Sequence, residues 1–373
     1  MTTWITRFAE SGPGISIAVK DLVDVAGVPT TAACRALADV AKPAERDAEC
    51  MREIRRRVEA GEAWLVGKTN LHELAYGTTG INPWFGTPVN PRYPQLLPGG
   101  SSSGSATAVA AGEAVVGIGS DTGGSVRIPA ACCGIAGLKT TWGRIPTTGV
   151  WPLSPSLDTI GPLAADVAGL TSAMQLFEPG FATGRVDDVA VGRVRLPGED
   201  VNPAVEAAVD EVLRRLGVAV SEVTLPQWGD AWSAGDVILS AEAWRVDREL
   251  LQSSPDGIGE LTASRIAAGE SVTVDAERAA RKAQLKWQKE LDAAFDDVAV
   301  LALPVLRDVP PEVDSQPVGL NRLTMPLNVA GLPALSLPAA EVDGRPVAIQ
   351  LVAPAYGEEL LLSFGAAVEA ALN

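Results

Sequence analysis

The 373-residue sequence predicts an α/β protein in which a central sheet is covered by helices. Short runs of aliphatic and β-branched residues alternate with longer stretches of helical periodicity along most of the chain. Hydrophobic residues make up 47% of the sequence, which is enough for a sizeable core. Because neither an internal repeat nor a low-complexity linker interrupts this alternation, we expect one domain over residues 1–373.

The first part of the chain supplies three expected strands and two expected helices. Residues 15–19, 63–66 and 115–119 are short apolar runs typical of buried strands. Residues 45–59 carry apolar side chains at helical spacing, and residues 104–114 are almost all small. Small side chains let backbones approach closely, so we expect the helix at 104–114 to be buried.

The character of the sequence changes after residue 165, where the helical stretches become longer. A loop-prone stretch at residues 253–259 does not mark a clear domain boundary. The expected strands cover residues 189–196, 298–304, 333–339 and 347–353, and the expected helices cover residues 166–177, 203–216, 231–252, 274–294 and 358–372.

Composition excludes several classes of function. A formal net charge of −16 argues against nucleic acid or an anionic membrane as a partner. No apolar run is long enough to span a membrane and the first residues lack a secretory segment, so we expect a cytoplasmic protein. The four cysteines show neither metal-ligand nor disulfide spacing. Since His72 is the single histidine, a histidine-rich metal site is excluded, and we expect neither a metal nor a cofactor.

Two glycine-serine segments carry the chemical information. In residues 98–105, PGGSSSGS, a serine is suited to capping the following helix, and the Walker pattern for binding phosphate is absent. In residues 117–130, GIGSDTGGSVRIPA, either the glycines present Ser125 as a nucleophile or the segment is a flexible turn. Lys20 ends an apolar strand, where it is either a buried base or a surface lysine with its stem along the apolar surface. With only one histidine in the chain, a lysine base becomes the more attractive interpretation.

The longest of these segments resemble the amidase signature family. The resemblance rests on PGGSSSGSATAVAAG, GIGSDTGGSVRIPAACCGIAGLKTTWGRIP and ISIAVKDLVDVAGVPTT, with shorter matches such as GKTNLHELAYG, SPSLDTIGPLA and TMPLNVAGLPALSLPA. It implies a single α/β domain with a large mixed sheet between helix layers. The matches fall in residues 15–165 and 320–373, which we expect to form the catalytic core, with a variable helical region at 166–300.

The resemblance also implies the catalytic residues. Ser125 matches the family's nucleophile, Ser101 its bridging serine with a cis peptide bond after Gly100, and Lys20 its base. The backbone N–H groups of the nucleophile and of the three residues before it match the oxyanion hole, which therefore comprises Thr122, Gly123, Gly124 and Ser125.

Physical chemistry supports these roles. A serine hydroxyl is a weak nucleophile until a base takes its proton, and burial lowers the pKa of a lysine towards the range useful for a base. A hydroxyl both donates and accepts, so Ser101 is suited to relay a proton from Ser125 to Lys20. We expect Asp121 and Arg127 to brace the loop around the nucleophile, and His72 to pack or hydrogen-bond within a helix rather than act as a base.

Substrate contacts are less constrained. Trp84, Phe85 and Trp151 fall in segments that in the family lie near the substrate entrance, and Arg322 precedes a segment near the edge of the family's site. Each of them is therefore a candidate for substrate binding, the alternatives being core packing for the aromatic residues and solvent exposure for Arg322. Core packing is expected for Trp228, Trp232 and Trp244.

The implied reaction is hydrolysis of a small-molecule amide through an acyl-enzyme, with release of ammonia or an amine. Alternatives are a hydrolase of ureido acids or carbamates, and a subunit like that of the glutamyl-tRNA amidotransferase, working in a complex. Lys20 comes early and the segment before 324 is short, so we expect a truncated N-terminal helical layer. The short chain argues against a long acyl channel and weakens the amidotransferase interpretation. A homodimer is one assembly left open.

Overall fold

The computed structural model of the protein describes residues 2–9, 11–184, 189–315 and 317–372. One mixed sheet of eleven strands runs through the described chain in the order β1-β3-β2-β4-β6-β5-β10-β11-β9-β7-β8. The strands are β1 (Trp4–Arg7), β2 (Ile15–Lys20), β3 (Ala63–Thr69), β4 (Val116–Asp121), β5 (Ala136–Lys139), β6 (Thr159–Ala164), β7 (Val191–Arg195), β8 (Val220–Thr224), β9 (Val300–Pro304), β10 (Ala334–Val342) and β11 (Arg345–Val352).

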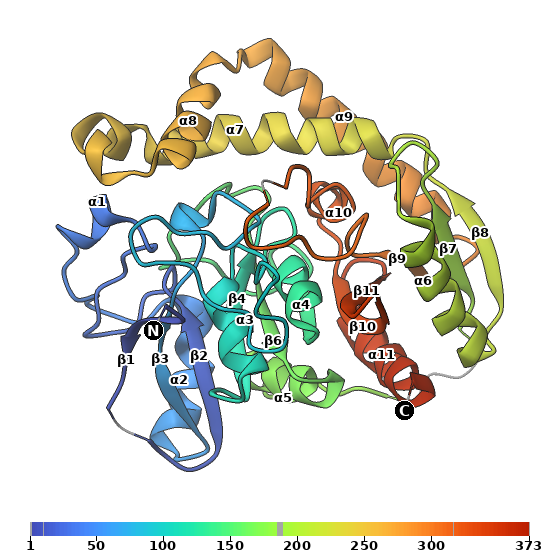
Figure 1. Cartoon of the computed structure of the whole chain (residues 1–373), viewed down its shortest axis with the longest axis horizontal. Coiled ribbons are helices and arrows are strands. Elements are labelled where there is room, and N and C mark those ends of the chain that lie inside the picture. Colours follow the sequence, from blue (N-terminus) through green and yellow to red (C-terminus); the bar gives the residue numbers. More distant parts are fainter. Residues whose placement is uncertain (1, 10, 185–188, 316, 373) are drawn as a thin grey trace.

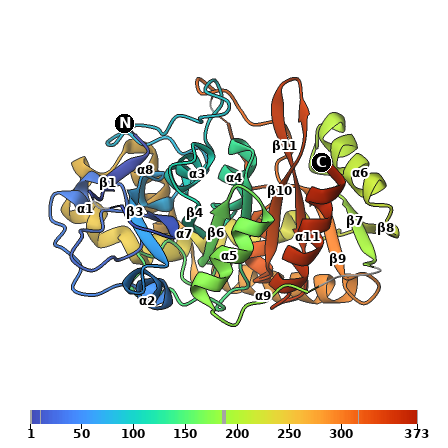
Figure 2. The ribbon, with the colours of Figure 1, turned by 90° about the horizontal axis from the view of Figure 1, so that it is seen from below.

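Helices cover both faces of the sheet, as the sequence predicts. Figure 2 shows α3 and α4 on one side of the sheet and α2, α5 and α11 on the other. In Figure 1, α7, α8 and α9 form an arch across one end of the strands. The helices are α1 (Arg35–Ala38), α2 (Arg52–Glu59), α3 (Ser103–Ala110), α4 (Arg127–Cys133), α5 (Val167–Phe177), α6 (Pro203–Leu216), α7 (Trp228–Ser253), α8 (Glu260–Ala268), α9 (Val274–Ala294), α10 (Met325–Ala330) and α11 (Glu358–Leu372).

The expected elements are present, and α6, α9 and α11 have the expected bounds. Two helices are shorter than expected. The helix expected at 45–59 begins at Arg52 after one 3-10 turn, because Ala48 N–H bonds to Asp24 in a neighbouring segment. The helix expected at 104–114 ends at Ala110, and Gly112 turns the chain with a φ of 71°. Both differences come from local contacts that helical periodicity does not report.

The sequence did not reveal several short elements. These are β1, β5, β6, β8, α1, α4, α8 and α10. Strand β6, TIGPLA, contains both Gly161 and Pro162, which are unusual in a strand interior, and it is nevertheless paired with β4 and β5. Helix α4 carries Pro129 at its third residue and is completely buried. Tertiary packing therefore overrides weak local propensity in the core of the fold.

Parallel strands bring the chemical groups to one edge of the sheet. Strands β2 and β4 pair in parallel with Val19 opposite Ile118, and they end at Lys20 and Asp121. The carboxyl ends of parallel strands are where α/β folds place their ligands. Helix α7 crosses the same end of the strands in Figure 1.

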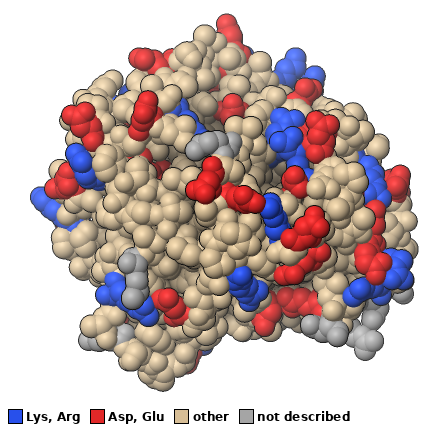
Figure 3. Space-filling model, viewed as in Figure 1, with Lys and Arg blue, Asp and Glu red and all other residues tan. Residues whose placement is uncertain are grey.

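The surface shows no large field of one sign on the face drawn in Figure 3, where basic and acidic side chains are interspersed. Within the described ranges, no helix combines the length and the apolar character that a bilayer span needs.

Candidate active site

Lys20 is the central group of the site. Its side chain is fully buried, and Nζ donates to Ser101 Oγ at 2.7 Å and to Ser120 Oγ at 2.8 Å. Burial lowers the pKa of Lys20 from 10.5 to about 7, although the carboxylates of Asp121 and Asp158 act to raise it. With this pKa, about half of the lysine is neutral at pH 7, so it can accept a proton from a hydroxyl.

Ser101 follows the cis peptide bond after Gly100, as the resemblance led us to expect. The backbone there is packed tightly, since a Cβ at Gly100 would lie 2.6 Å from Gly80 N. The carbonyl of Ser101 accepts from His72 N–H at 3.0 Å. These contacts hold the Ser101 hydroxyl against the end of β2, where Lys20 reaches it.

Asp121 and Arg127 brace the loop at residues 122–125, and this expectation is confirmed. Both side chains are fully buried and form an ion pair at 2.9 Å. Asp121 also accepts from Gly124 N at 2.7 Å and from Val126 N at 3.1 Å. Burial acts to raise the pKa of Asp121, but the charge and hydrogen bonds of Arg127 outweigh it and hold the pKa below its usual range. The loop is therefore a hydrogen-bonded structure rather than a flexible turn.

The loop leaves three backbone donors free of partners within the described chain, the N–H groups of Thr122, Gly123 and Ser125. The fourth donor expected in the oxyanion hole, Gly124 N–H, is occupied by Asp121. The role of Gly124 is conformational, since its φ is 128° and a Cβ would lie 2.2 Å from Thr324 Oγ1. No residue with a side chain fits at this position without displacing its neighbours.

Ser125 lies beside the segment that carries Ser101. The carbonyl of Ser125 accepts from Ser102 N–H at 3.1 Å. Among the described hydrogen bonds, none joins the hydroxyls of Ser101 and Ser125. Catalytic hydrogen bonds are often long before substrate binds, so the adjacency of the two segments is the more informative observation.

Ser125 opens into a cleft of about 210 Å³. The walls come from residues 75–79, the loop at 122–125, α7, α8 and residues 317–325. Asp236 and Arg265 supply opposite charges to the cleft, and neither forms an ion pair with another described residue. Arg265 Nη1 donates to the carbonyl of Tyr76 at 2.6 Å, which directs the guanidinium along the cleft wall.

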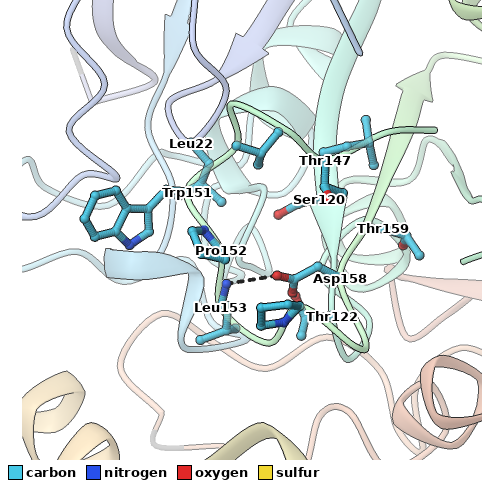
Figure 4. Close-up of a pocket in the computed structure, with 12 residues that line it drawn as sticks. Leu22, Ser120, Thr122, Thr147, Trp151, Pro152, Leu153, Asp158 and Thr159 are labelled. Atoms are coloured by element: carbon cyan, nitrogen blue, oxygen red, sulfur yellow. Dashed lines mark hydrogen bonds between the residues drawn. The ribbon is translucent and has the colours of Figure 1, made fainter. Parts of the chain in front are cut away.

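A second, smaller cavity of about 40 Å³ lies behind the loop and is drawn in Figure 4. Ser120, Thr122 and Asp158 are among the residues around it. The sequence pattern pointed to neither Ser120 nor Asp158. Ser120 lies beside Lys20 because β4 and β2 are neighbouring parallel strands. This neighbourhood becomes evident only once the strand order is known.

The sequence candidates for substrate contact lie elsewhere. Trp84 Nε1 donates to Glu73 at 2.6 Å, and Phe85 is partly buried and packs against a hydrophobic core cluster that includes residues of α7. Trp151 borders the smaller cavity rather than the cleft. Arg322 pairs with Glu199 at 2.6 Å. None of these four side chains lines the cleft at Ser125.

Other aromatic residues take that place. Tyr76 and Trp232 line the cleft, and the guanidinium of Arg322 lies 4.3 Å from the centre of the Trp232 ring, behind it. Trp228 begins α7, packs edge-on against Trp287 at 5.5 Å and belongs to the core, as expected. Trp232 lies one helical turn further along α7, where its ring reaches the site.

His72 is buried, and its backbone N–H donates to the carbonyl of Ser101. Burial lowers the pKa of His72 to about 3, so the ring is neutral at physiological pH. Its Nδ1 lies 3.3 Å from Thr79 Oγ1. The residue packs and hydrogen-bonds, at the start of a short 3-10 turn. No cluster of three or more His, Cys, Asp or Glu side chains suited to a metal occurs in the part of the chain that the structure describes.

Comparison with known proteins places the chain in the class of hydrolases that act on C–N bonds. The family model described as Amidase matches residues 12–362, and the chain belongs to the amidase family. A glutamyl-tRNA(Gln) amidotransferase subunit of Halobacterium salinarum is 34% identical over 420 residues, covering 97% of this chain and 96% of that protein.

Two further relatives are an amidase and a hydrolase subunit. The AtzE subunit of the 1-carboxybiuret hydrolase of Pseudomonas sp. is 32% identical over 386 residues, covering 94% of this chain and 82% of that protein. A crystal structure of an amidase superposes with a TM-score of 0.89 at 32% identity, covering 96% of this chain and 84% of that one. The short chain does not argue against an amidotransferase after all, because the match spans 96% of the Halobacterium salinarum protein.

Proposed function

We propose that the protein is an amidohydrolase that cleaves a carboxylic amide through an acyl-enzyme on Ser125, with Ser101 as the bridging serine and Lys20 as the base. The single observation that carries this proposal is the buried Lys20 Nζ, 2.7 Å from Ser101 Oγ and with its pKa lowered to about 7. A base with a pKa near the working pH combines availability with proton affinity.

The proposed steps balance without a cofactor. Neutral Lys20 takes a proton from Ser101 while Ser101 takes one from Ser125, whose Oγ attacks the carbonyl carbon. The partnerless N–H groups of the 122–125 loop stabilise the developing oxyanion. The proton returns through Ser101 to the leaving nitrogen as the C–N bond breaks. Water then attacks the ester by the same proton path and releases the carboxylic acid.

A second candidate function is supported by the charges of the cleft. Asp236 and Arg265 face the same cleft as Ser125 without an ion-pair partner among the described residues. A substrate with both an ammonium and a carboxylate would complement them, and glutamine is such an amide. The protein would then release ammonia for a partner protein, a role in keeping with its similarity to a glutamyl-tRNA(Gln) amidotransferase subunit.

The test is ammonia or amine release from a panel of simple amides, aryl amides, ureido acids, carbamates and glutamine. Ser125→Ala should abolish release from every active substrate. Ser103→Ala is the matched control, because its buried hydroxyl has no hydrogen-bond partner in the described chain. Labelling of wild-type Ser125 by a fluorophosphonate, located by peptide mass, would identify the nucleophile. Full turnover by Ser125→Ala would refute the mechanism.

The two candidates separate on glutamine and on partners. A stand-alone hydrolase turns over non-zwitterionic amides as a purified single chain. An amidotransferase-like subunit prefers glutamine, gains activity with a partner chain, and loses glutamine turnover in Arg265→Met while retaining turnover of neutral amides.

A further inference from the structure

Carboxylates hold the loop at residues 122–125 at both of its ends. Asp121 accepts from Gly124 and Val126, on the side of α4. At the other end, Thr122 Oγ1 donates to Asp158 Oδ1 at 2.6 Å. Gly123 lies between these anchors and has no side chain of its own, so its position depends on them and on Thr324 Oγ1, which donates to the Gly123 carbonyl at 2.6 Å.

Asp158 is held entirely by hydrogen-bond donors. Oδ2 accepts from Leu153 N at 3.0 Å, and Ser154 N reaches both oxygens at 3.1 Å. No cationic side chain pairs with Asp158 among the described residues. Burial raises the pKa of Asp158, the Thr122 and backbone donors lower it, and the carboxylate of Glu242 raises it again. The carboxylate therefore serves as a clamp between the loop and residues 153–154.

The clamp lies in the wall between the two cavities. Thr122 and Leu153 line both the cleft at Ser125 and the smaller cavity behind it. Figure 4 shows Asp158 between them, with the dashed bond from Leu153 N–H. A change at Asp158 is thus transmitted to the cleft through Thr122, without any contact between Asp158 and a substrate in the cleft.

We propose that Asp158 is a positioning residue for catalysis, which acts through Thr122 to hold the N–H groups of Thr122 and Gly123 towards the acyl carbonyl bound at Ser125. This inference rests on the proposed Ser125 mechanism. Donors to an oxyanion are effective because they are already oriented before the charge develops. A displacement of about 1 Å can cost on the order of 100-fold in rate, so a single hydrogen bond at the edge of the loop has a large effect.

The charge of Asp158 has a separate effect that makes the test specific. Asp121 and Asp158 are the two carboxylates that raise the pKa of Lys20 against the effect of burial. Asp158→Asn removes one of these charges, so the pKa of Lys20 should fall further. Thr122→Val removes the hydrogen bond but leaves the charge in place, so the pKa of Lys20 should stay near its wild-type value.

The experiment measures kcat, KM and the pH profile of kcat/KM for five variants, four single and one double, on one active amide. Thr122→Val should lower kcat by about 10- to 100-fold with KM changed by less than about threefold. Thr122→Ser restores the hydroxyl and should recover most of the lost rate. Thr147→Val is the matched control, because Thr147 borders the same small cavity and has no bond to the loop.

Asp158→Asn should lower kcat as Thr122→Val does and move the acidic limb of the profile to lower pH. An asparagine has one acceptor oxygen, so it cannot serve both Thr122 and Leu153 as the carboxylate does. Both substitutions act on the same hydrogen bond, the one between Thr122 and Asp158. The double variant should therefore be no slower than Asp158→Asn alone.

Two results would overturn the inference, a wild-type kcat in Thr122→Val and multiplied losses in the double variant. If Asp158→Asn does not fold, the Thr122→Val and Thr122→Ser pair still decides the question. Ser125→Ala separates the two hypotheses. If Ser125→Ala is inactive and Thr122→Val is fully active, only the proposed role of Asp158 is refuted. If Ser125→Ala is active, the proposed Ser125 mechanism itself is refuted.

Discussion

The pH dependence of catalysis is the sharpest test of Lys20 as the base. With the usual pKa of 10.5, about one lysine in 3,000 is neutral at pH 7, whereas with a pKa of about 7 the fraction is about one half. Burial therefore increases the supply of neutral base by roughly 1,500-fold at this pH. We expect kcat/KM to rise about tenfold per pH unit below pH 7 and to level off above about pH 8.

Lys20→Met removes the base and should lower kcat/KM by at least about 100-fold at pH 8. The same substitution should stabilise the fold at pH 7. The folded-state pKa of Lys20 lies below its unfolded value of 10.5, so stability rises with pH between about 7 and 10.5. Below pH 7, charged and buried Lys20 lowers the free energy of unfolding by up to roughly 5 kcal/mol compared with its value above pH 10.5. A Lys20→Met protein with a higher melting temperature and no activity would exclude unfolding as the cause of the lost activity.

The chain provides a matched control in a second buried lysine. Burial lowers the pKa of Lys139 to about 7 as well, and its Nζ donates to Leu332 O at 2.7 Å rather than to a serine of the site. Lys139→Met should leave the pH limb of kcat/KM where it is in the wild type. A flat wild-type profile between pH 6 and 8, or a limb that moves with Lys139 instead of Lys20, would refute the reasoning.

Three further predictions concern the supports of the site. Asp247→Asn should raise the melting temperature at pH 8, because burial raises the pKa of Asp247 to about 7 and one of its oxygens is buried without a partner among the described residues. The folded-state pKa lies above 3.8, so the wild-type stability falls between about pH 4 and 7. A difference between variant and wild type that does not change with pH would contradict this. Gly124→Ala should lower kcat by more than about 100-fold with near-native circular dichroism, since its Cβ would lie 2.2 Å from Thr324 Oγ1, and turnover near the wild-type level would show that the loop is pliable. Arg127→Met leaves Asp121 charged and buried, and should cost about 3–5 kcal/mol in urea unfolding; a loss below about 1 kcal/mol would mean that the pair does not brace the loop.

The sequence alone was sufficient for the fold class, and it also predicts the reacting groups. Alternating strand and helix patterns predict an α/β protein because buried strands and amphipathic helices have different periodicities. The triad candidates Lys20, Ser101 and Ser125 come from glycine-serine segments whose resemblance to a family is long and specific. The bracing role of Asp121 and Arg127 follows from two opposite charges close in sequence within one loop, and the structure confirms it.

Tertiary structure decided what surrounds those groups. Residues that line the cleft, such as Tyr76, Asp236 and Arg265, come from loops and helices far apart in the chain, and no local pattern brings them together. The substrate candidates Trp84, Phe85, Trp151 and Arg322 were proposed from neighbouring segments, but their side chains pair or pack elsewhere.

The loop at residues 122–125 shows the same division within a few residues. Its glycines are evident in the sequence, since only glycine tolerates the backbone that Gly124 adopts. Which N–H groups stay without a partner among the described residues depends on Asp121 accepting from Gly124 N–H, whereas Asp158, from another segment of the chain, accepts from the hydroxyl of Thr122. The amino-acid sequence determines which chemical groups are available. The strand order β2-β4-β6 determines which of these groups come into contact. Hydrogen bonds act over about 3 Å, so they depend on distance in space and not on separation along the chain.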